Sequence, residues 1–173
     1  MHTREETLNR LAEIVKFVKK IKAKELNFDA WGRYNPKCGT ICCVMGWLTE
    51  SNMYSLKWAT HRYSYPTLEG ENCFRFSGFD AARNILFGDI GAWTEAAGAD
   101  QIDGRQLLYG WARGIATNLF GVTGDSSYDE EIAMDHDINK LSHKKLFLLR
   151  VGHATADINN LYDEIEAENA RVK

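Results

Sequence analysis

Three of the four cysteines of the chain lie close together, in the segment Cys38-Gly39-Thr40-Ile41-Cys42-Cys43-Val44-Met45-Gly46-Trp47. We predict a helix over residues 41–50, with the Thr40 hydroxyl accepting from the free backbone N–H groups of its first turn. Cys38 would then precede a helix N-terminus, where the helix dipole favours a thiolate. This arrangement suggests a nucleophilic cysteine.

A cysteine nucleophile also needs a base, and the sequence marks out no histidine for that role. His153 follows a glycine, but it lies within a predicted helix and has Asp157 four residues later, which indicates a surface pair. A small buried thiol at a loop-to-helix junction is the simpler interpretation of Cys38, since free cysteine is often buried. A cysteine-dependent hydrolase or transferase using Cys38 is kept as an alternative, and the candidate bases are His61, His136, His143 and His153.

Zinc is the second chemistry that these cysteines suggest. Structural zinc sites usually take two pairs of closely spaced ligands. The candidate ligands are Cys38, Cys42 or Cys43, Cys73 and His61. Cys38 and Cys42 could form one pair, whereas Cys73 and His61 are isolated. We therefore predict no metal and no cofactor, and a zinc-stabilised interaction module is a further alternative.

An acidic stretch over residues 125–137 contains no lysine or arginine. An EF-hand loop beginning at Asp135 fails, because Lys140 stands where glycine is needed and Leu146 where the bidentate glutamate is needed. We predict a solvated, flexible loop over residues 121–137 instead.

The elements that must position these residues are predicted to be mostly helical. Apolar residues recur at helical spacing in several segments, and cap signals mark where those segments begin and end. Thr3 and Glu6 form a capping box, and Gly88 and Gly121 are helix stops. The predicted helices begin after Thr3, run over 79–87, run from an Asp103 cap to 120, and begin again after Ser142.

One β-hairpin is predicted over residues 62–77. Tyr63 and Tyr65 alternate with polar residues on one arm, and Phe74 and Phe76 do so on the other. With the first and last helices pairing, the fold class is mainly α, a single helical domain over 1–173 with one small β-hairpin. Gly110 and Gly114, four residues apart on one helix, are predicted to admit a neighbouring backbone, within the chain or across a subunit interface.

Composition limits the partners. The chain has 173 residues, 45% of them hydrophobic, and a net charge of −3. This charge gives no general attraction to nucleic acid or to an anionic membrane. Glycine-rich loops of nucleoside triphosphatases and of dinucleotide-binding folds are absent from the sequence. Closely spaced cysteines without a disulfide framework, and an N-terminus without a signal-peptide core, favour a cytoplasmic protein.

The segments Phe28-Asp29-Ala30-Trp31 and Cys38-Gly39-Thr40-x-x-Cys43-x-x-Gly46-Trp47 resemble a group of small uncharacterised bacterial and bacteriophage proteins. In that group a Phe-Asp…Trp segment precedes a Cys-Gly-Thr-x-x-Cys-x-x-Gly-Trp/His segment. No activity is established for the group, so the resemblance implies no catalytic residues. It favours a cytoplasmic protein and is compatible with a phage origin. Within the motif, Cys43, Gly46 and Trp47 lie along one face of the predicted helix, which indicates a mainly architectural role.

We therefore predict a non-enzymatic, intracellular binding protein, acting on a host protein or on a small nucleotide ligand if the chain is phage-encoded. Aromatic side chains are favoured anchors of recognition surfaces, and a helix start at Thr40 would add N–H donors. Homo-oligomerisation is left open. The predicted binding surface consists of Trp31, Tyr34, Cys38, Thr40, Tyr63 and Tyr65.

Overall fold

The structure is a computed structural model that describes residues 1–28, 32–35, 39–58, 66–68, 78–95 and 102–171. It is mainly α-helical, as predicted. Short 3-10 turns, η1 (Ala23–Glu25), η2 (Met53–Ser55) and η4 (Ile138–Lys140), join some of the longer elements. The helices are α1 (Arg4–Lys20), α2 (Val44–Glu50), α3 (Phe79–Phe87), α4 (Ile90–Glu95), α5 (Ile102–Phe120), α6 (Ser127–Asp135) and α7 (His143–Arg171).

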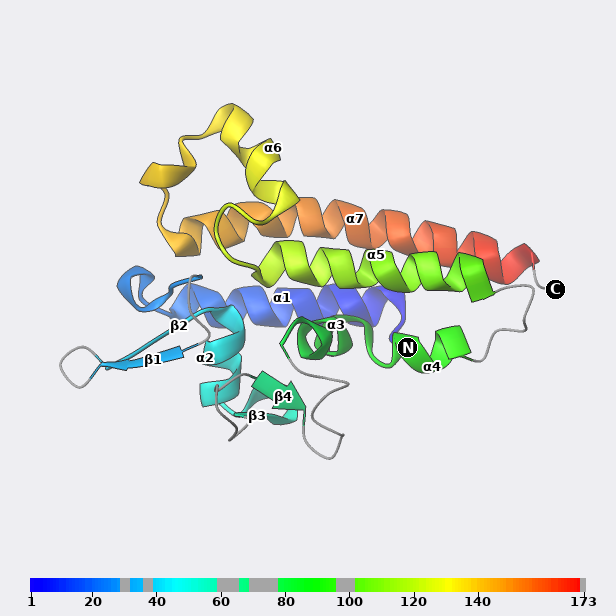
Figure 1. The fold of residues 1–173 in the computed structure, drawn as a ribbon, viewed down its shortest axis with the longest axis horizontal. Helices are drawn as coiled ribbons and strands as arrows, with labels where there is room; N and C mark the ends of the chain where they lie inside the picture. Colours follow the sequence, from blue (N-terminus) through cyan, green and yellow to red (C-terminus); the bar gives the residue numbers. More distant parts are fainter. Residues whose placement is uncertain (29–31, 36–38, 59–65, 69–77, 96–101, 172–173) are drawn as a thin grey trace.

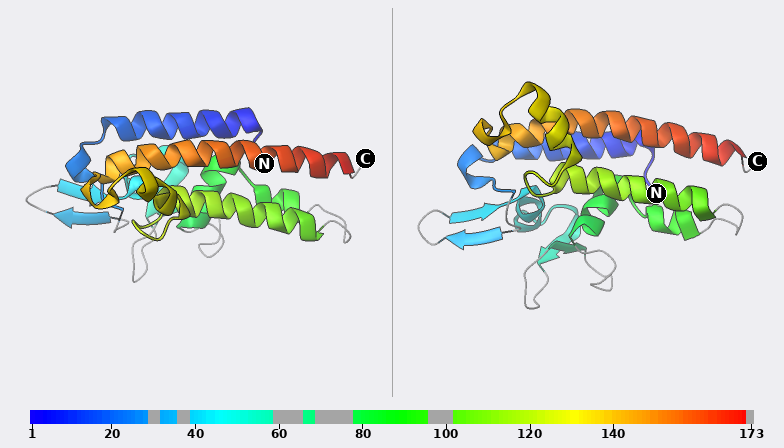
Figure 2. Two further views of the ribbon diagram at one scale, coloured as in Figure 1. Left: turned by 90° about the horizontal axis from the view of Figure 1, so that it is seen from above. Right: turned by 45° about the horizontal axis from the view of Figure 1, so that its top comes forward.

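The three longest helices, α1, α5 and α7, lie side by side as one layer, and α3 and α4 pack against it next to α5 (Figures 1 and 2). The first and last helices pair, as the sequence predicts, and they run antiparallel. Helix α7 contributes the longest buried stripe, in which Phe147, Ala154 and Ile158 are fully buried. Burying such side chains is the main favourable contribution to folding, roughly 1.5–3 kcal/mol for each large one.

Helix α1 begins and ends as its sequence indicates. The Thr3 hydroxyl accepts from the Glu6 N–H at 3.2 Å, and the Glu6 carboxylate accepts from the Thr3 N–H at 2.7 Å. At the other end the Lys144 ammonium donates to the carbonyl oxygens of Lys19 and Ile21, each at 2.6 Å. This cation satisfies carbonyl groups that the helix itself leaves unpaired.

Glycine residues end α3 and α5 where predicted, but two others do not pack as expected. Gly88 follows α3 with φ +67°, a conformation that favours glycine. Gly110 and Gly114 face open space, because a Cβ at either position would meet nothing within 4 Å among the contacts described. Among the described residues, the prediction of close backbone packing within the chain is therefore wrong. Helix α5 also begins at Ile102, so Asp103 lies inside the helix rather than capping it.

Two short antiparallel strand pairs lie below the layer of long helices in Figure 1. Strand β1 (Gly32–Asn35) pairs with β2 (Gly39–Cys42), and β3 (Leu56–Trp58) pairs with β4 (Pro66–Leu68). Of the predicted hairpin over residues 62–77 the structure describes only β4, and β4 pairs with the earlier strand β3. Leu56 is fully buried and fixes β3 against the core. Residues 59–65 and 69–77 lie outside the described part.

Candidate functional site

Cys43, rather than Thr40, caps the helix of the cysteine segment. Thr40 lies within β2, where its backbone pairs with Tyr34 of β1, and α2 begins only at Val44. The Cys43 sulfur accepts from the Gly46 N–H at 3.4 Å. The predicted Thr40 cap is therefore wrong, because pairing with β1 keeps the chain extended through Cys42.

The Cys43 thiol is poorly suited to nucleophilic chemistry. Its residue is 2% exposed, and burial raises the pKa of the thiol to about 11. With this pKa, about 0.1% of the thiol would be ionised at pH 8. The thiolate is the reactive form, so little of Cys43 could react. Cys43 serves instead as a helix cap and a packing residue.

The rest of the cysteine segment fastens α2 to the core. Gly46 is buried, and Trp47 is half-buried with its indole N–H donating to the Glu25 carbonyl at 2.9 Å. Met45 and Leu48 are fully buried on the same short helix. The chain that leaves β2 therefore enters the core at once.

Phe28, which precedes β1, is also buried against the core. It is 2% exposed, and its backbone N–H donates to His143 Nδ1 at 3.0 Å. Because Nδ1 accepts this bond, its lone pair is engaged and is not free to act as a base. The Phe28 ring also lies near Phe147, with ring centroids 6.4 Å apart. The first residue of the Phe28-Asp29-Ala30-Trp31 segment is thus fixed by α7.

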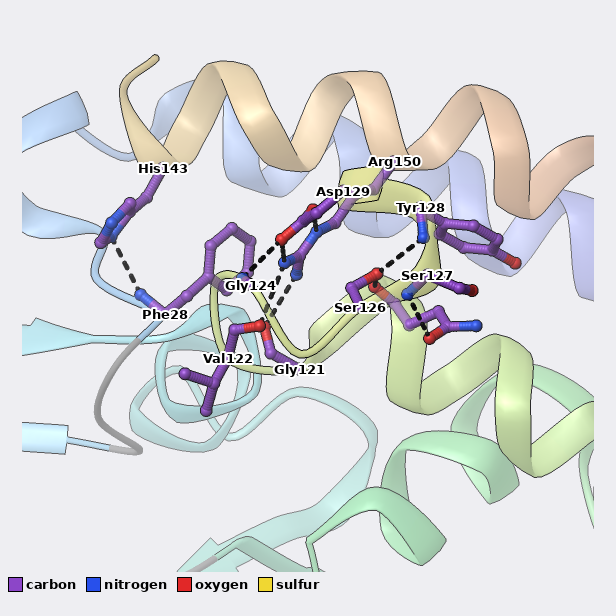
Figure 3. A network of polar contacts seen from close by, with 11 residues as sticks. Phe28, Gly121, Val122, Gly124, Ser126, Ser127, Tyr128, Asp129, His143 and Arg150 are labelled. Carbon is purple, nitrogen blue, oxygen red and sulfur yellow. Dashed lines mark hydrogen bonds and ion pairs between the residues drawn. The ribbon is translucent and has the colours of Figure 1, made fainter. Parts of the chain in front are cut away.

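A buried ion pair lies beside the ring of Phe28 (Figure 3). Arg150 and Asp129 are 0% and 2% exposed at their side chains. The guanidinium donates to both carboxylate oxygens, from Nε at 2.7 Å and from Nη2 at 2.6 Å. Its Nη1 donates to the Gly121 carbonyl at 2.8 Å, and its carbon lies 4.6 Å from the centre of the Phe28 ring. The pair therefore joins α6, α7 and Phe28.

The prediction of a flexible loop over residues 121–137 is wrong for its second half, because α6 occupies residues 127–135. The Ser126 hydroxyl caps this helix by accepting from the Tyr128 N–H at 3.2 Å. Two sequence signals pointed to this arrangement. Ser126 precedes acidic residues in the manner of a helix start, and Arg150 lies among the apolar residues of α7, where a buried charge needs a partner.

His153 contacts residues other than the one predicted. Its Nδ1 lies 2.8 Å from a Glu131 carboxylate oxygen, and its ring stacks on Tyr128 with centroids 5.5 Å apart. Asp157, the expected partner, instead accepts from the Tyr128 hydroxyl at 2.7 Å. The partner lies on α6, because α6 packs where a solvated loop was expected. Burial and the Asp157 carboxylate raise the pKa of Tyr128 well above its ordinary value.

Two of the six predicted binding residues fall within the described strands. Tyr34 and Thr40 are cross-strand backbone partners in the β1–β2 hairpin. The histidine and cysteine of the zinc alternative, His61 and Cys73, lie outside the described residues, as does Cys38. So do the remaining predicted binding residues, Trp31, Tyr63 and Tyr65.

Within the described ranges, no three His, Cys, Asp or Glu side chains are grouped so that they could hold a metal ion. Every helix in that part of the chain is too short or too polar to cross a lipid bilayer. No protein family, curated protein or solved structure with which the chain was compared matches it.

Proposed function

We propose that the protein is a non-enzymatic binding protein that recognises a partner protein through residues 29–42, which include the β1–β2 hairpin. One observation carries this proposal. The flanking residues Phe28 and Cys43 are buried in the core, and the paired strands β1 and β2 lie on one side of the layer of long helices (Figures 1 and 2). A strand pair whose flanking residues are fixed is suited to presenting recognition residues.

The fixed ends matter for affinity. Phe28 is held by the His143 ring and by the Arg150 guanidinium, and Cys43 is held as the cap of α2. A loop with fixed ends has fewer conformations to lose when a partner binds, so less of the interaction energy is spent on ordering it. Supporting contacts of this kind are typical of preorganised binding sites.

The residue types of the segment support recognition of a protein surface. Trp31 and Tyr34 are of the kinds most enriched among residues that dominate binding energies. Thr40 is the cross-strand partner of Tyr34, and Cys38 immediately precedes β2. We include Tyr63 and Tyr65 in the same proposed surface. If the chain is phage-encoded, its partner is a host protein and the complex forms in the cytoplasm.

A pull-down with matched variants tests this proposal. Immobilised wild-type protein, Trp31→Ala and Tyr34→Ala are exposed to a lysate of the natural host, and retained proteins are quantified by mass spectrometry. Leu107→Ala is the control, because Leu107 is an apolar residue of α5 that is 75% exposed. We expect a protein that wild type and the control retain equally and that both hairpin variants lose at least tenfold. Retention that is the same for all four proteins contradicts the proposal.

Cys38→Ser separates binding from the cysteine-dependent alternative. A binding surface retains most of its affinity when a thiol becomes a hydroxyl of similar size. A nucleophilic cysteine that holds its partner covalently loses the adduct completely. The measurement is denaturing electrophoresis of the captured complex, which preserves a covalent adduct and dissociates a non-covalent one.

A further inference from the structure

A groove of about 560 Å³ is lined by residues of α1 and α7. Leu8 and Val15 of α1 and Val151 of α7 line it, and each remains partly exposed. Ala12 and Thr155, both small, also line it, and Ala12 is exposed. Half-exposed apolar side chains around small residues leave room for another helix to approach closely.

The face of α1 that lines this groove carries opposite charges at the two ends of the helix. Glu5 lies seven residues before Ala12 and Lys19 lies seven residues after it, so each charge is two turns, about 10 Å, from the centre. Both side chains are exposed. Lys16 adds a second positive charge to the groove at the Lys19 end.

Helix α7 strengthens this polarity at the Glu5 end. Arg4 is bound by two carboxylates of α7, Asp163 at 2.6 Å and Glu166 at 2.8 Å. These two carboxylates are 65% and 68% exposed, so one arginine leaves an excess negative charge at this end. The groove is therefore basic at its Lys19 end, and acidic side chains of α1 and α7 lie beyond its other end.

We propose that a second copy of this chain occupies the groove, with its α1 antiparallel to the first α1 about a twofold axis near Ala12. Glu5 of each copy then faces Lys19 of the other, and the two Ala12 residues meet at the axis. Such a contact is isologous, since the same face is used by both copies. The apolar residues around Ala12 are covered on both copies.

The polarity of the groove favours a second copy over a uniformly charged ligand. An acidic helix or an anionic lipid would be attracted by Lys16 and Lys19 and repelled by Glu5 and Glu166. An antiparallel copy presents the opposite charge at both ends. If the hairpin recognises a partner as proposed above, the dimer presents two hairpins at opposite ends and binds two partner sites.

Sedimentation velocity over a range of protein concentrations tests the dimer, with the full chain at 0.15 M salt and circular dichroism to confirm folding. Ala12→Arg places two like charges at the axis, and we expect it to abolish the dimer. Lys19→Glu should weaken dimerisation at least tenfold. Adding Glu5→Lys to it should restore the affinity to within about threefold of wild type. Lys20→Glu is the matched control, because it makes the same change on α1 outside the groove, and it should leave dimerisation unchanged.

Three results overturn this proposal. The first is a wild-type protein that is monomeric at all concentrations up to about 1 mM. The second is a dimer that Ala12→Arg leaves intact, and the third is a double reversal that does not restore what Lys19→Glu removes. None of these outcomes bears on the hairpin, because the variants that test partner recognition lie in the β1–β2 segment.

Discussion

Replacing Asp129 by asparagine should destabilise the protein more than any surface substitution. The Asp129 carboxylate accepts from Arg150 Nε and Nη2 and from the Gly124 N–H, the last at 2.8 Å. Asparagine keeps one acceptor oxygen and directs an NH₂ group at donors that need an acceptor. The Arg150 guanidinium, 0% exposed, then has no counter-charge among the residues that the structure describes.

The expected magnitude follows from what remains around Arg150. Removing one partner of a buried ion pair typically costs about 3–5 kcal/mol, because the other charge is left buried. Here the carbonyl oxygens of Gly121 and Val122 still accept from the guanidinium, at 2.8 and 3.3 Å. The Phe28 ring also still faces the cation. We therefore expect a loss of about 3 kcal/mol, at the lower end of that range.

Urea unfolding at pH 7, followed by circular dichroism, measures this loss. Asp163→Asn is the control, because it removes one carboxylate from an exposed pair in which Arg4 keeps Glu166, and it should change the free energy of unfolding by less than about 0.5 kcal/mol. Adding Arg150→Met to Asp129→Asn removes the unpaired charge, so the double variant should lose less than the sum of the single variants. A loss below about 1 kcal/mol for Asp129→Asn would refute the reasoning.

Three further outcomes are expected. Thr3→Ala removes the cap of α1 and should lower the free energy of unfolding in urea by about 1 kcal/mol. Gly88→Ala adds a Cβ at φ +67° and 2.9 Å from His2 Cδ2, so thermal unfolding should occur several degrees lower. Gly110→Ala adds a Cβ in open space within a helix, so it should raise the midpoint of thermal unfolding. Because burial raises the pKa of Cys43 to about 11, the folded state retains a proton that the unfolded thiol loses above about pH 8.5. The urea midpoint should therefore fall between pH 8.5 and 11, with a smaller slope in Cys43→Ala; equal slopes would contradict this origin.

The helix boundaries that were predicted correctly depend on local chemistry. The Thr3 capping box, the Ser142 cap of α7 and the Gly88 stop each involve residues within four positions of one another. Hydrogen bonds between groups so close in sequence form locally and do not depend on contacts with the rest of the chain. These signals were therefore sufficient to place α1, α3 and the start of α7.

The misplaced elements depend on contacts between distant residues. Thr40 is a good cap residue, yet pairing of β2 with β1 extends the chain past it, and the cap passes to Cys43. Helix α6 was missed because its acidic surface resembles a solvated loop. Its stability depends on Asp129 meeting Arg150, 21 residues later in the chain. In the sequence, such a pair is visible only as a charged residue, here Arg150, among the apolar residues of a helix.

The buried ion pair is better explained by its role in orienting neighbouring groups than by a contribution to stability. Apolar side chains of similar volume could fill the same space at comparable stability, since the desolvation of two charges offsets much of their attraction. A bidentate pair does what an apolar contact does not, because it sets distances and directions. Arg150 simultaneously orients Asp129 of α6, the Gly121 carbonyl after α5 and the ring of Phe28. Phe28 immediately precedes the segment proposed to bind the partner. The ion pair therefore fixes the position of the first end of that segment relative to α7.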